Sequence, residues 1–232
     1  MTVTYHTHFE QGSEAWLQAR CGVLSASEMK LIVPPPPKEE TRVKKNGEPY
    51  KKREWVVVAD DDACRTHVYE LAAQRLTKCV EPVFVTNDML RGQIDEEEAR
   101  ALYSQRFSPV EQVGFITNDK WGFTLGYSPD GLVDKRRGGI ETKSRRQKYQ
   151  VQTLIENVLT DTIPAEYLMQ HQTGILVAEL DWIDFVSFSR GLPMGVVRVW
   201  PDDQIQAAIL EASHAAEAKI AKILQTFQES FQ

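Results

Sequence analysis

Residues 128–143 read SPDGLVDKRRGGIETK, and they place two acids and a lysine close together in the chain. GLVDK and GIETK are short β-prone runs with turn-forming residues between them, which predicts two neighbouring strands joined through RRGG. Because side chains alternate across a strand, Glu141 and Lys143 share one face while Thr142 points away. Asp130 then lies at the start of the adjacent strand. The stretch therefore predicts one face that gathers two carboxylates and an ammonium group.

This combination of groups suits a divalent cation and a phosphate ester. Two carboxylates and a main-chain carbonyl, here that of Thr142, are hard oxygen ligands for Mg²⁺, which keeps several waters for a substrate phosphate. Such a metal lowers the pKa of a bound water and neutralises charge on a phosphoryl oxygen. Lys143 would orient or help deprotonate the attacking water and stabilise the developing oxyanion. Taken alone, the spacing D-x10-ExK is more typical of an exposed hairpin turn with charged side chains, so both interpretations stay open at this point.

Charge is distributed unevenly along a chain whose net charge is −6. Residues 42–53 carry six Lys or Arg against one Glu, and residues 135–148 carry seven against Glu141. Each basic stretch could be solvated surface, but two of them, one overlapping the carboxylates, favour a phosphate-rich partner.

The remaining bulk properties are those of a globular protein. The sequence is 42% hydrophobic and 26% charged, which is ordinary for such a domain. We expect no transmembrane helix, because no apolar run approaches about 18 residues. The N-terminus lacks the pattern of a secretory signal, and three cysteines without a CxxC motif predict reduced thiols. These features predict a cytoplasmic protein.

The predicted organisation is one mixed α/β domain over residues 1–232, with a basic, proline-rich surface loop at 34–54. Ser13 is expected to cap a helix that Gly22 stops, and SASE has the spacing of a capping box. The other predicted helices are 55–77, 88–107, one that starts at Pro164 and runs through EYLMQHQTGILVAE, and a C-terminal helix over 202–230. The predicted strands are VEQVGFIT, WGFTLGYS, GLVDK and GIETKS, which form an antiparallel meander between 110 and 143, then WIDFVSFS and GVVRVW. The C-terminal helix has an apolar stripe that should face the core: Ile205, Ile209, Ala212, Ala216, Ile220, Ile223 and Phe227.

The quoted stretch also resembles a known motif. SPDG-x9-ETK has the form of the PD-(D/E)xK nuclease motif, and further stretches resemble one branch of that superfamily. That branch is the phage-lambda-type exonucleases used in recombination, the YqaJ-like viral recombinase and alkaline exonuclease family. EAWLQARCGVLSASE (14–28) is similar to its first motif, RGQIDEEEAR (91–100) to its second, and YLMQHQ (167–172) to the helix after the catalytic strands. The resemblance follows the family's order over about residues 10–190, and it implies a restriction-endonuclease-like core with a central mixed sheet flanked by helices.

The resemblance implies roles for individual residues. Asp130 and Glu141 would be the main metal ligands, together with the Thr142 carbonyl, and Lys143 would be the catalytic lysine. Glu96 matches the family's helix-borne acid, placed to contact a second metal or its waters. On its own terms, Glu96 is also explained by an i,i+4 ion pair with Arg100 on a solvated helix face. Gln170 matches the site glutamine of the family.

A second group of residues would bind the DNA end. Arg20 and Ser27 match the positions that capture the terminal 5′-phosphate in the family, and Ser25 lies beside them at a helix start, where free N–H groups attract an anion. The alternatives are helix capping for the serines and a surface ion pair for Arg20.

Tyr167, Arg137 and Arg145 are the remaining candidates for DNA contacts. Tyr167 shares a helix face with Gln170 and could equally be a core aromatic. Gln172 points away from Gln170 and is the weaker candidate for the site. His171 has no second His or Cys at a metal-binding spacing and is not expected to be a ligand.

The resemblance thus implies a Mg²⁺-dependent 5′→3′ exonuclease that uses one or two ions, with Mn²⁺ substituting. It would digest one strand of linear double-stranded DNA from a 5′-phosphate end, releasing 5′-mononucleotides and leaving a 3′ single strand. The family implies a ring-shaped homotrimer, a single-strand-annealing recombinase as partner, and a bacteriophage or prophage protein acting in the bacterial cytoplasm, away from any membrane.

Three alternatives stay open at the level of sequence. The chain could be another PD-(D/E)xK endonuclease, a catalytically silent DNA-end-binding recombination accessory protein, or a protein with no nucleic-acid role whose basic stretches are solvated loops. An iron–sulfur nuclease is disfavoured because three scattered cysteines cannot supply a four-cysteine cluster.

Overall fold

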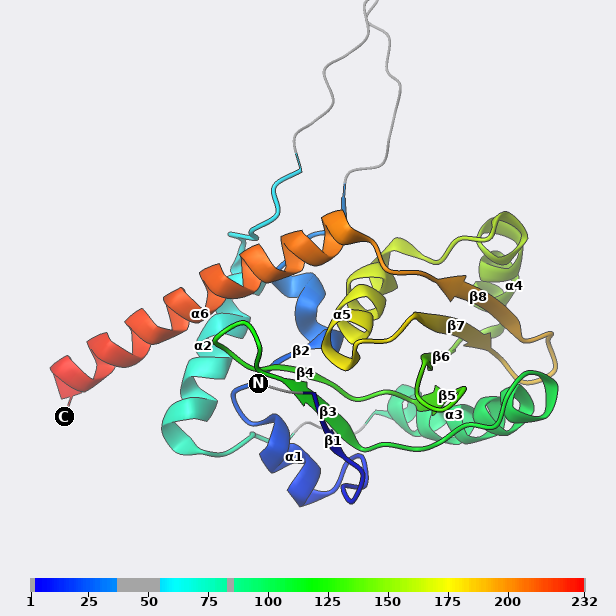
Figure 1. Cartoon of the computed structure of the whole chain (residues 1–232), viewed down its shortest axis with the longest axis horizontal. Helices are drawn as coiled ribbons and strands as arrows, with labels where there is room; N and C mark the ends of the chain where they lie inside the picture. The colour runs from blue at the N-terminus through cyan, green and yellow to red at the C-terminus, as the bar shows by residue number, and fades with distance from the viewer. Residues whose placement is uncertain (1–2, 37–54, 83–85, 232) are drawn as a thin grey trace, which may run out of the picture.

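The computed structural model describes residues 3–36, 55–82 and 86–231, and shows a mixed α/β chain with two four-stranded sheets (Figure 1). The predicted basic loop at 34–54 lies, apart from its first three residues, outside the described residues. None of the described helices combines the length and the apolar composition that crossing a membrane requires.

The sheet that carries the quoted stretch has the strand order β5-β6-β7-β8. β5 (Gly131–Val133) and β6 (Gly138–Ser144) are antiparallel neighbours, as predicted. β7 (Trp182–Phe188) runs parallel to β6, and β8 (Gly195–Val199) is antiparallel to β7. Every residue of β7 is buried, which fits its nearly continuous apolar run and its central place in the sheet.

The other sheet has the order β1-β3-β4-β2. Its strands are β1 (Thr4–His6), β3 (Phe115–Asn118), β4 (Leu125–Tyr127) and β2 (Leu24–Ser25). The predicted single meander between 110 and 143 is therefore wrong. The chain leaves one sheet after β4 and enters the other at β5, and the connection contains Pro129, which has no N–H to extend a strand ladder.

Capping side chains define the starts of the N-terminal helices. Ser13, Asp61 and Thr86 each accept a hydrogen bond from a backbone N–H of the first turn that follows. The helices are α1 (Glu14–Arg20), the 3-10 turn η1 (Ala26–Leu31), α2 (Asp62–Thr77), α3 (Asn87–Arg106), α4 (Gln147–Glu156), the 3-10 turns η2 (Val158–Thr160) and η3 (Ala165–Tyr167), α5 (Leu168–Ala178) and α6 (Asp203–Phe231). The predicted helix start at 55 is wrong, because Asp61 is the N-cap and the residues before it are not helical.

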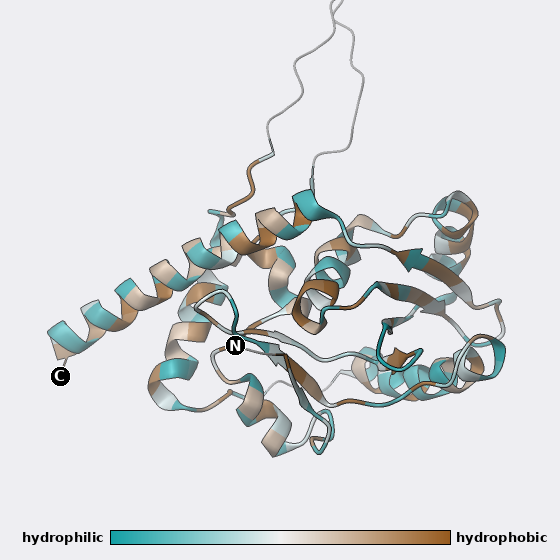
Figure 2. Ribbon diagram, viewed as in Figure 1, coloured by the Kyte–Doolittle hydropathy of each residue, from teal (hydrophilic) through white to brown (hydrophobic). Residues whose placement is uncertain are grey.

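Helix α5 lies between the two sheets and brings them together (Figure 1). A Cβ atom at Gly174 would lie 2.8 Å from atoms of Tyr127 in β4 and of Ile183 in β7. Only a glycine permits this close approach of the helix to both sheets. In Figure 2 apolar residues are prominent on α5 and the strands beside it, whereas α3 is mostly hydrophilic. The core that α5 organises therefore fixes the relative position of β4 and β6, which is where the candidate site lies.

The hairpin between β5 and β6 differs from the prediction in one detail. The turn is formed by residues 134–137, and Asp134, Lys135 and Arg136 have φ values of 50°, 56° and 69°. Gly138 already belongs to β6, where a Cβ would lie 2.3 Å from the Trp182 ring. The two glycines are therefore explained by close packing inside the sheet, and the turn itself consists of residues that rarely adopt this conformation.

Replacing Lys135 by glycine should stabilise the protein. The Lys135 side chain is exposed and its backbone is left-handed, a conformation that costs a non-glycine residue about 1–2 kcal/mol. After the larger loss of backbone entropy for glycine, we expect the free energy of unfolding to rise by about 0.5–1 kcal/mol, measured by urea denaturation. Lys148→Gly in the first turn of α4 is the control and should lower it; a fall for Lys135→Gly would contradict this account of the turn.

Helix α6 continues past the body of the protein. Ile205, Ile209 and Ile220 are buried, as predicted, together with Ala212 and Ala216. Phe227 is 39% exposed, because the last turns of α6 extend beyond the rest of the chain (Figure 1). The predicted core stripe is therefore correct only as far as Ile220, with Ile223 partly buried.

Candidate active site

The quoted stretch forms a cluster of polar groups at the junction of the two sheets. The pairing of Gly131 with Ile140 sets Asp130 beside Glu141 in the next step of the ladder. The Thr142 backbone N–H donates a hydrogen bond to Asp130 Oδ2. The predicted proximity of these groups is thus present in the structure, with Glu141 and Lys143 on one face of β6.

Glu141 is a buried carboxylate held by three donors. It is 3% exposed, and its Oε1 accepts hydrogen bonds from Lys143 Nζ, at 2.8 Å, and from Gln170 Nε2. Tyr127 OH donates to Oε2 at 3.1 Å. Burial first, and then the charges of Glu141 and Asp130, raise the pKa of Tyr127 well above its usual value, so the phenol keeps the proton that it donates. Tyr127 comes from the other sheet and was not among the predicted site residues.

The acids of the cluster repel one another. Burial, followed by the charges of Glu141 and Glu96, raises the pKa of Asp130 well above its usual value. The pKa of Glu96 is also raised, chiefly by burial and partly by Glu141, against the opposing effect of Arg100. Such mutual repulsion in a partly dehydrated place is what a divalent cation would relieve.

The donor set fits Mg²⁺ with a small number of protein ligands. Glu141 and the Thr142 carbonyl on β6, and Asp130 directly before the adjacent β5, are hard oxygen groups, which suits an ion that keeps several waters. In the described part of the chain, no three Asp, Glu, His or Cys side chains form a complete metal site by themselves. Glu96 is bound instead to Arg100, whose Nε also donates to the Asp130 carbonyl at 2.9 Å.

Lys143 is held as a cation. Burial lowers its pKa, but the attraction of Glu141 and Asp130 outweighs burial, so that the pKa of Lys143 is raised. Its Nζ lies 5.3 Å from the centroid of the Tyr167 ring, within the range of a cation–π contact. Tyr167 OH accepts a hydrogen bond from Arg145 Nη1 at 2.7 Å. Tyr167 and Arg145 therefore extend the cluster on the side of Lys143.

Gln170 and Gln172 of α5 point in different directions, as their spacing along the helix predicts. Gln170 reaches Glu141, whereas Gln172 binds the Trp200 carbonyl and the Asp202 N–H and so has a packing role. His171 is fully buried, and its Nδ1 lies 2.8 Å from the Tyr167 carbonyl oxygen. Burial lowers the pKa of His171 to about 4, so its ring is neutral near pH 7.

Arg137 lies outside the cluster. Its guanidinium pairs with Asp181 at 2.8 Å and with Asp134 at 3.5 Å. It precedes β6, six residues before Lys143, which places it about 20 Å along the strand from that lysine. The structure thus does not bring Arg137 to the other predicted site residues.

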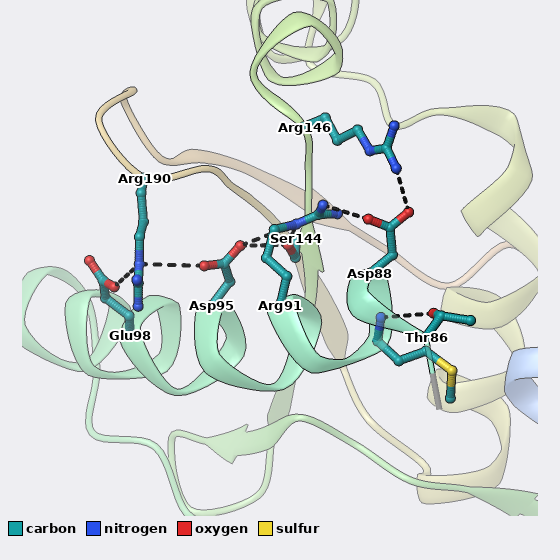
Figure 3. Close-up of polar contacts among 9 residues, drawn as sticks. Thr86, Asp88, Arg91, Asp95, Glu98, Ser144, Arg146 and Arg190 are labelled. Carbon is teal, nitrogen blue, oxygen red and sulfur yellow. Dashed lines mark hydrogen bonds and ion pairs between the residues drawn. The ribbon is translucent and has the colours of Figure 1, made fainter. Parts of the chain in front are cut away.

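A polar network fastens α3, the helix that carries Glu96, to the end of β6 (Figure 3). Its centre is Asp95, which is 4% exposed and accepts a 2.6 Å hydrogen bond from the Ser144 hydroxyl. Arg91 Nε lies 3.8 Å and Arg190 Nε 3.5 Å from the same carboxylate. Asp95 therefore links α3 to the strand end that follows Lys143. Nothing in the acidic run DEEE (95–98) indicates that its first residue, Asp95, is the buried one.

Replacing Asp95 by alanine should destabilise the protein more than the replacement of a polar residue usually does. Asp95→Ala leaves the partly buried Ser144 hydroxyl and two arginines without their shared carboxylate, and we expect a loss of about 2–3 kcal/mol in the free energy of unfolding. Glu98→Ala is the matched control, because among the described residues Glu98 pairs only with the exposed Arg190, and it should cost about 0.5 kcal/mol or less. Equal losses in the two variants, measured by urea denaturation, would show that Asp95 does not have this linking role.

A second cluster surrounds Arg20 at the end of α1. Arg20 stacks on the Trp16 ring, with its guanidinium carbon 4.5 Å from the ring centroid. Its Nη2 donates to the hydroxyls of Ser25, at 3.1 Å, and of Ser27, at 3.4 Å. Ser128 completes the group, because its hydroxyl accepts a 3.0 Å bond from Arg20 Nη1.

This second cluster has the chemistry of an anion site. One guanidinium and three hydroxyls converge there, and such groups bind phosphate oxygens. Burial lowers the pKa of Arg20, although the charge of Glu28 opposes the shift, and a guanidinium stays charged under such conditions. Glu28 accepts a 2.9 Å bond from the Ser25 hydroxyl, so the expected capping box does not form here. Sequence reasoning missed Ser128, although it opens the quoted stretch.

Comparisons with known proteins identify the family of the chain and proteins that share its fold. A family model described as the YqaJ-like viral recombinase domain matches residues 15–181. No curated protein sequence matches the chain significantly. Among solved structures, an alkaline exonuclease from Laribacter hongkongensis, LHK-Exo, is 26% identical, with a TM-score of 0.70 over 94% of this chain and 99% of that one. The same figures hold for its complex with dAMP. A phage-related exonuclease from Haemophilus somnus 129PT is 18% identical, with a TM-score of 0.55 over 88% of this chain and 96% of that one, and shows a shared fold.

Proposed function

The chain belongs to the family of YqaJ-like viral recombinase domains, and from this premise we propose that it is a Mg²⁺-dependent 5′→3′ exonuclease. It would digest one strand of linear double-stranded DNA and leave a 3′ single strand for recombination by strand annealing. The observation that carries the proposal is the pairing of two clusters, a carboxylate–lysine cluster and an arginine–serine cluster, joined through Ser128 and Asp130. The first suits hydrolysis of a phosphodiester, and the second suits capture of a terminal phosphate.

Asp130, Glu141 and the Thr142 carbonyl would hold one Mg²⁺, and Glu96 would contact a second ion or its waters. When bound, the ion supplies Lewis acidity toward the scissile phosphate. We expect Mn²⁺ to substitute, because it accepts the same oxygen ligands. Arg100 must then release or share Glu96, since the two side chains are paired.

The other residues of the first cluster would orient the reacting groups. Lys143, cationic and 2.8 Å from Glu141, would position the attacking water and stabilise negative charge on the phosphate. Gln170 and Tyr127 hold the Glu141 carboxylate by hydrogen bonds and so fix the orientation of a metal ligand. Tyr167 and Arg145 would contact the DNA backbone beside Lys143.

The direction of digestion follows from the second cluster. A site for a terminal 5′-phosphate formed by Arg20, Ser25, Ser27 and Ser128 would hold the strand so that the next phosphodiester reaches the carboxylates. Hydrolysis there would release a 5′-mononucleotide. The complex of LHK-Exo with dAMP, a molecule of this kind, supports that product.

Membership in the family also supports the proposed partners. We infer a ring-shaped homotrimer that encircles DNA, and a single-strand-annealing recombinase that receives the 3′ strand. A ring would reconcile a net charge of −6 with basic stretches, because positive charge facing a channel attracts DNA while the outside stays acidic.

One digestion experiment tests the function directly. A linear duplex labelled at either end, with and without Mg²⁺ and with 5′-phosphate or 5′-hydroxyl ends, reports activity, direction and end requirement together. A covalently closed circle is the control. Cleavage of the circle would favour a PD-(D/E)xK endonuclease, and end binding without cleavage would favour a silent accessory protein.

A further inference from the structure

A cavity of about 450 Å³ lies next to the proposed catalytic centre and has no role in the function described so far. Asp130 and Glu96 line it together with residues 7–11, the segment that follows β1. The cavity therefore borders two of the acids that are proposed to bind the metal.

Residues 7–11 are held firmly against the site. Gln11 Nε2 donates to the Pro129 carbonyl at 2.9 Å. Gly114 allows the closest approach, because a Cβ there would lie 2.0 Å from the Phe9 carbonyl oxygen. The Gly114 carbonyl in turn accepts a 3.0 Å bond from Trp16 Nε1, the residue on which Arg20 stacks. The segment thus has a fixed position relative to both clusters.

The segment also presents aromatic rings beside the cavity. The Phe9 ring stacks on His6 at 5.2 Å and 11°, and the His8 ring meets its edge at 4.2 Å. His8 is exposed and Phe9 is partly exposed. Nucleobases stack on such rings, and the stacking tolerates any base because every base has a π-face.

Charge indicates which part of a nucleotide the cavity can accept. Glu10, Glu96 and Asp130 line it, and Arg100, the arginine beside them, is paired with Glu96. The metal that Asp130 and Glu96 would hold neutralises their charge, which leaves Glu10 and the paired Arg100. The rest of the cavity therefore offers a phosphate little attraction and is compatible with an uncharged base. The cavity therefore suits the base and the sugar rather than the backbone charge.

The two phosphate positions define where the first nucleotide must lie. Ser128 belongs to the arginine–serine cluster and Asp130 to the catalytic cluster, so their Cα atoms can be at most about 7 Å apart. That span matches one sugar–phosphate repeat, and the residue between them, Pro129, lines the cavity. A nucleotide bound through its terminal 5′-phosphate at one cluster and its scissile phosphate at the other would thus have its base beside Pro129.

We propose that this cavity binds the nucleobase of the 5′-terminal nucleotide, with His8 and Phe9 as its stacking platform. The inference rests on the proposed exonuclease function and adds the part of the substrate that neither cluster contacts. The subsite would position the sugar so that the scissile phosphate meets the catalytic centre, and it would accept all four bases.

The test compares 5′-phosphorylated duplexes that differ only at the terminal nucleotide, which carries a base or is an abasic analogue. The rate of removal of the first nucleotide is measured in a single turnover for the wild type, His8→Ala and Phe9→Leu. Phe9→Leu keeps an apolar side chain against Gly114 and removes the aromatic face. His214→Ala, an exposed histidine on α6, is the matched control and should behave as the wild type.

With the wild type, we expect the abasic end to react at least about fivefold more slowly, as befits the loss of one base–aromatic stack. His8→Ala and Phe9→Leu should slow the normal end by a similar factor and leave the abasic end unchanged. Equal slowing of the normal and the abasic end by the two substitutions would overturn the subsite. Equal wild-type rates on the normal and the abasic end would overturn it as well. In both cases the exonuclease function would stand. Failure of the wild type to digest any end would overturn both proposals.

Discussion

Glu141→Gln should abolish digestion of linear duplex DNA in the presence of Mg²⁺. The substitution keeps the volume of a side chain that is 3% exposed, but removes the charge that would bind the metal. Because metal-assisted stabilisation of a phosphoryl transition state is worth several kcal/mol, we expect a fall of about a thousandfold or more in rate. Release of labelled mononucleotide from a 5′-phosphorylated duplex measures the effect.

The control for this prediction is Glu97→Gln on α3, which removes the same charge from an exposed side chain next to Glu96 and should keep wild-type activity. Thermal unfolding of both variants checks that the fold is intact. Asp130→Ala and Lys143→Ala should abolish activity as Glu141→Gln does. Wild-type digestion by all three variants would refute the proposed catalytic centre.

Arg20→Ala should impair digestion from 5′-phosphorylated ends far more than from 5′-hydroxyl ends. Its guanidinium donates to Ser128 at 3.0 Å and to Ser25 at 3.1 Å, and these are the groups proposed to surround the terminal phosphate. Loss of a charged donor pair costs about 1.5–3 kcal/mol, so we expect about a 10- to 100-fold fall for the phosphorylated end. Initial rates on the two substrates give the ratio directly.

Arg65→Ala provides the matched control for Arg20→Ala. Arg65 is an exposed arginine whose guanidinium carbon lies 5.9 Å from the Tyr69 ring centroid, so it reproduces the loss of an arginine over an aromatic ring at a position outside both clusters. It should affect neither substrate. Arg20→Lys keeps the charge without the forked geometry and should fall between the wild type and Arg20→Ala. An equal loss on both ends for Arg20→Ala would exclude a phosphate site at this position.

The carboxylate–lysine cluster could be predicted from sequence because short-range patterns determine it. Asp130 and Glu141 meet through one hairpin, and the alternation of side chains along β6 puts Lys143 beside Glu141. The helical spacing that separates Gln170 from Gln172 is equally local, and the structure confirms the separation, with Gln170 on Glu141 and Gln172 on the Trp200 carbonyl.

What the sequence could not show depends on contacts between distant segments. Tyr127 and Ser128 take their places only once β4 and β5 belong to different sheets. The burial of Asp95 depends on the packing of α3 against β6 and Arg190. Helix α4 was not predicted, although Val151, Leu154 and Ile155 lie at helical spacing, and its buried residues are the polar Gln150 and Thr153. Each case is a tertiary contact that overrides or supplements local propensity.

The crossing from β4 to β5 has a consequence for the step size of the proposed enzyme. The residue that would hold the strand end, Ser128, and the residue that would help to cut it, Asp130, are joined by covalent bonds through Pro129 rather than by packing between elements. Small movements of the two sheets, or binding of a partner elsewhere on the protein, can shift Ser128 and Asp130 together. They change the separation of the two residues very little, because Pro129 joins them covalently. Each cycle would therefore remove one nucleotide, and an insertion at Pro129 would be the most direct way to change that number.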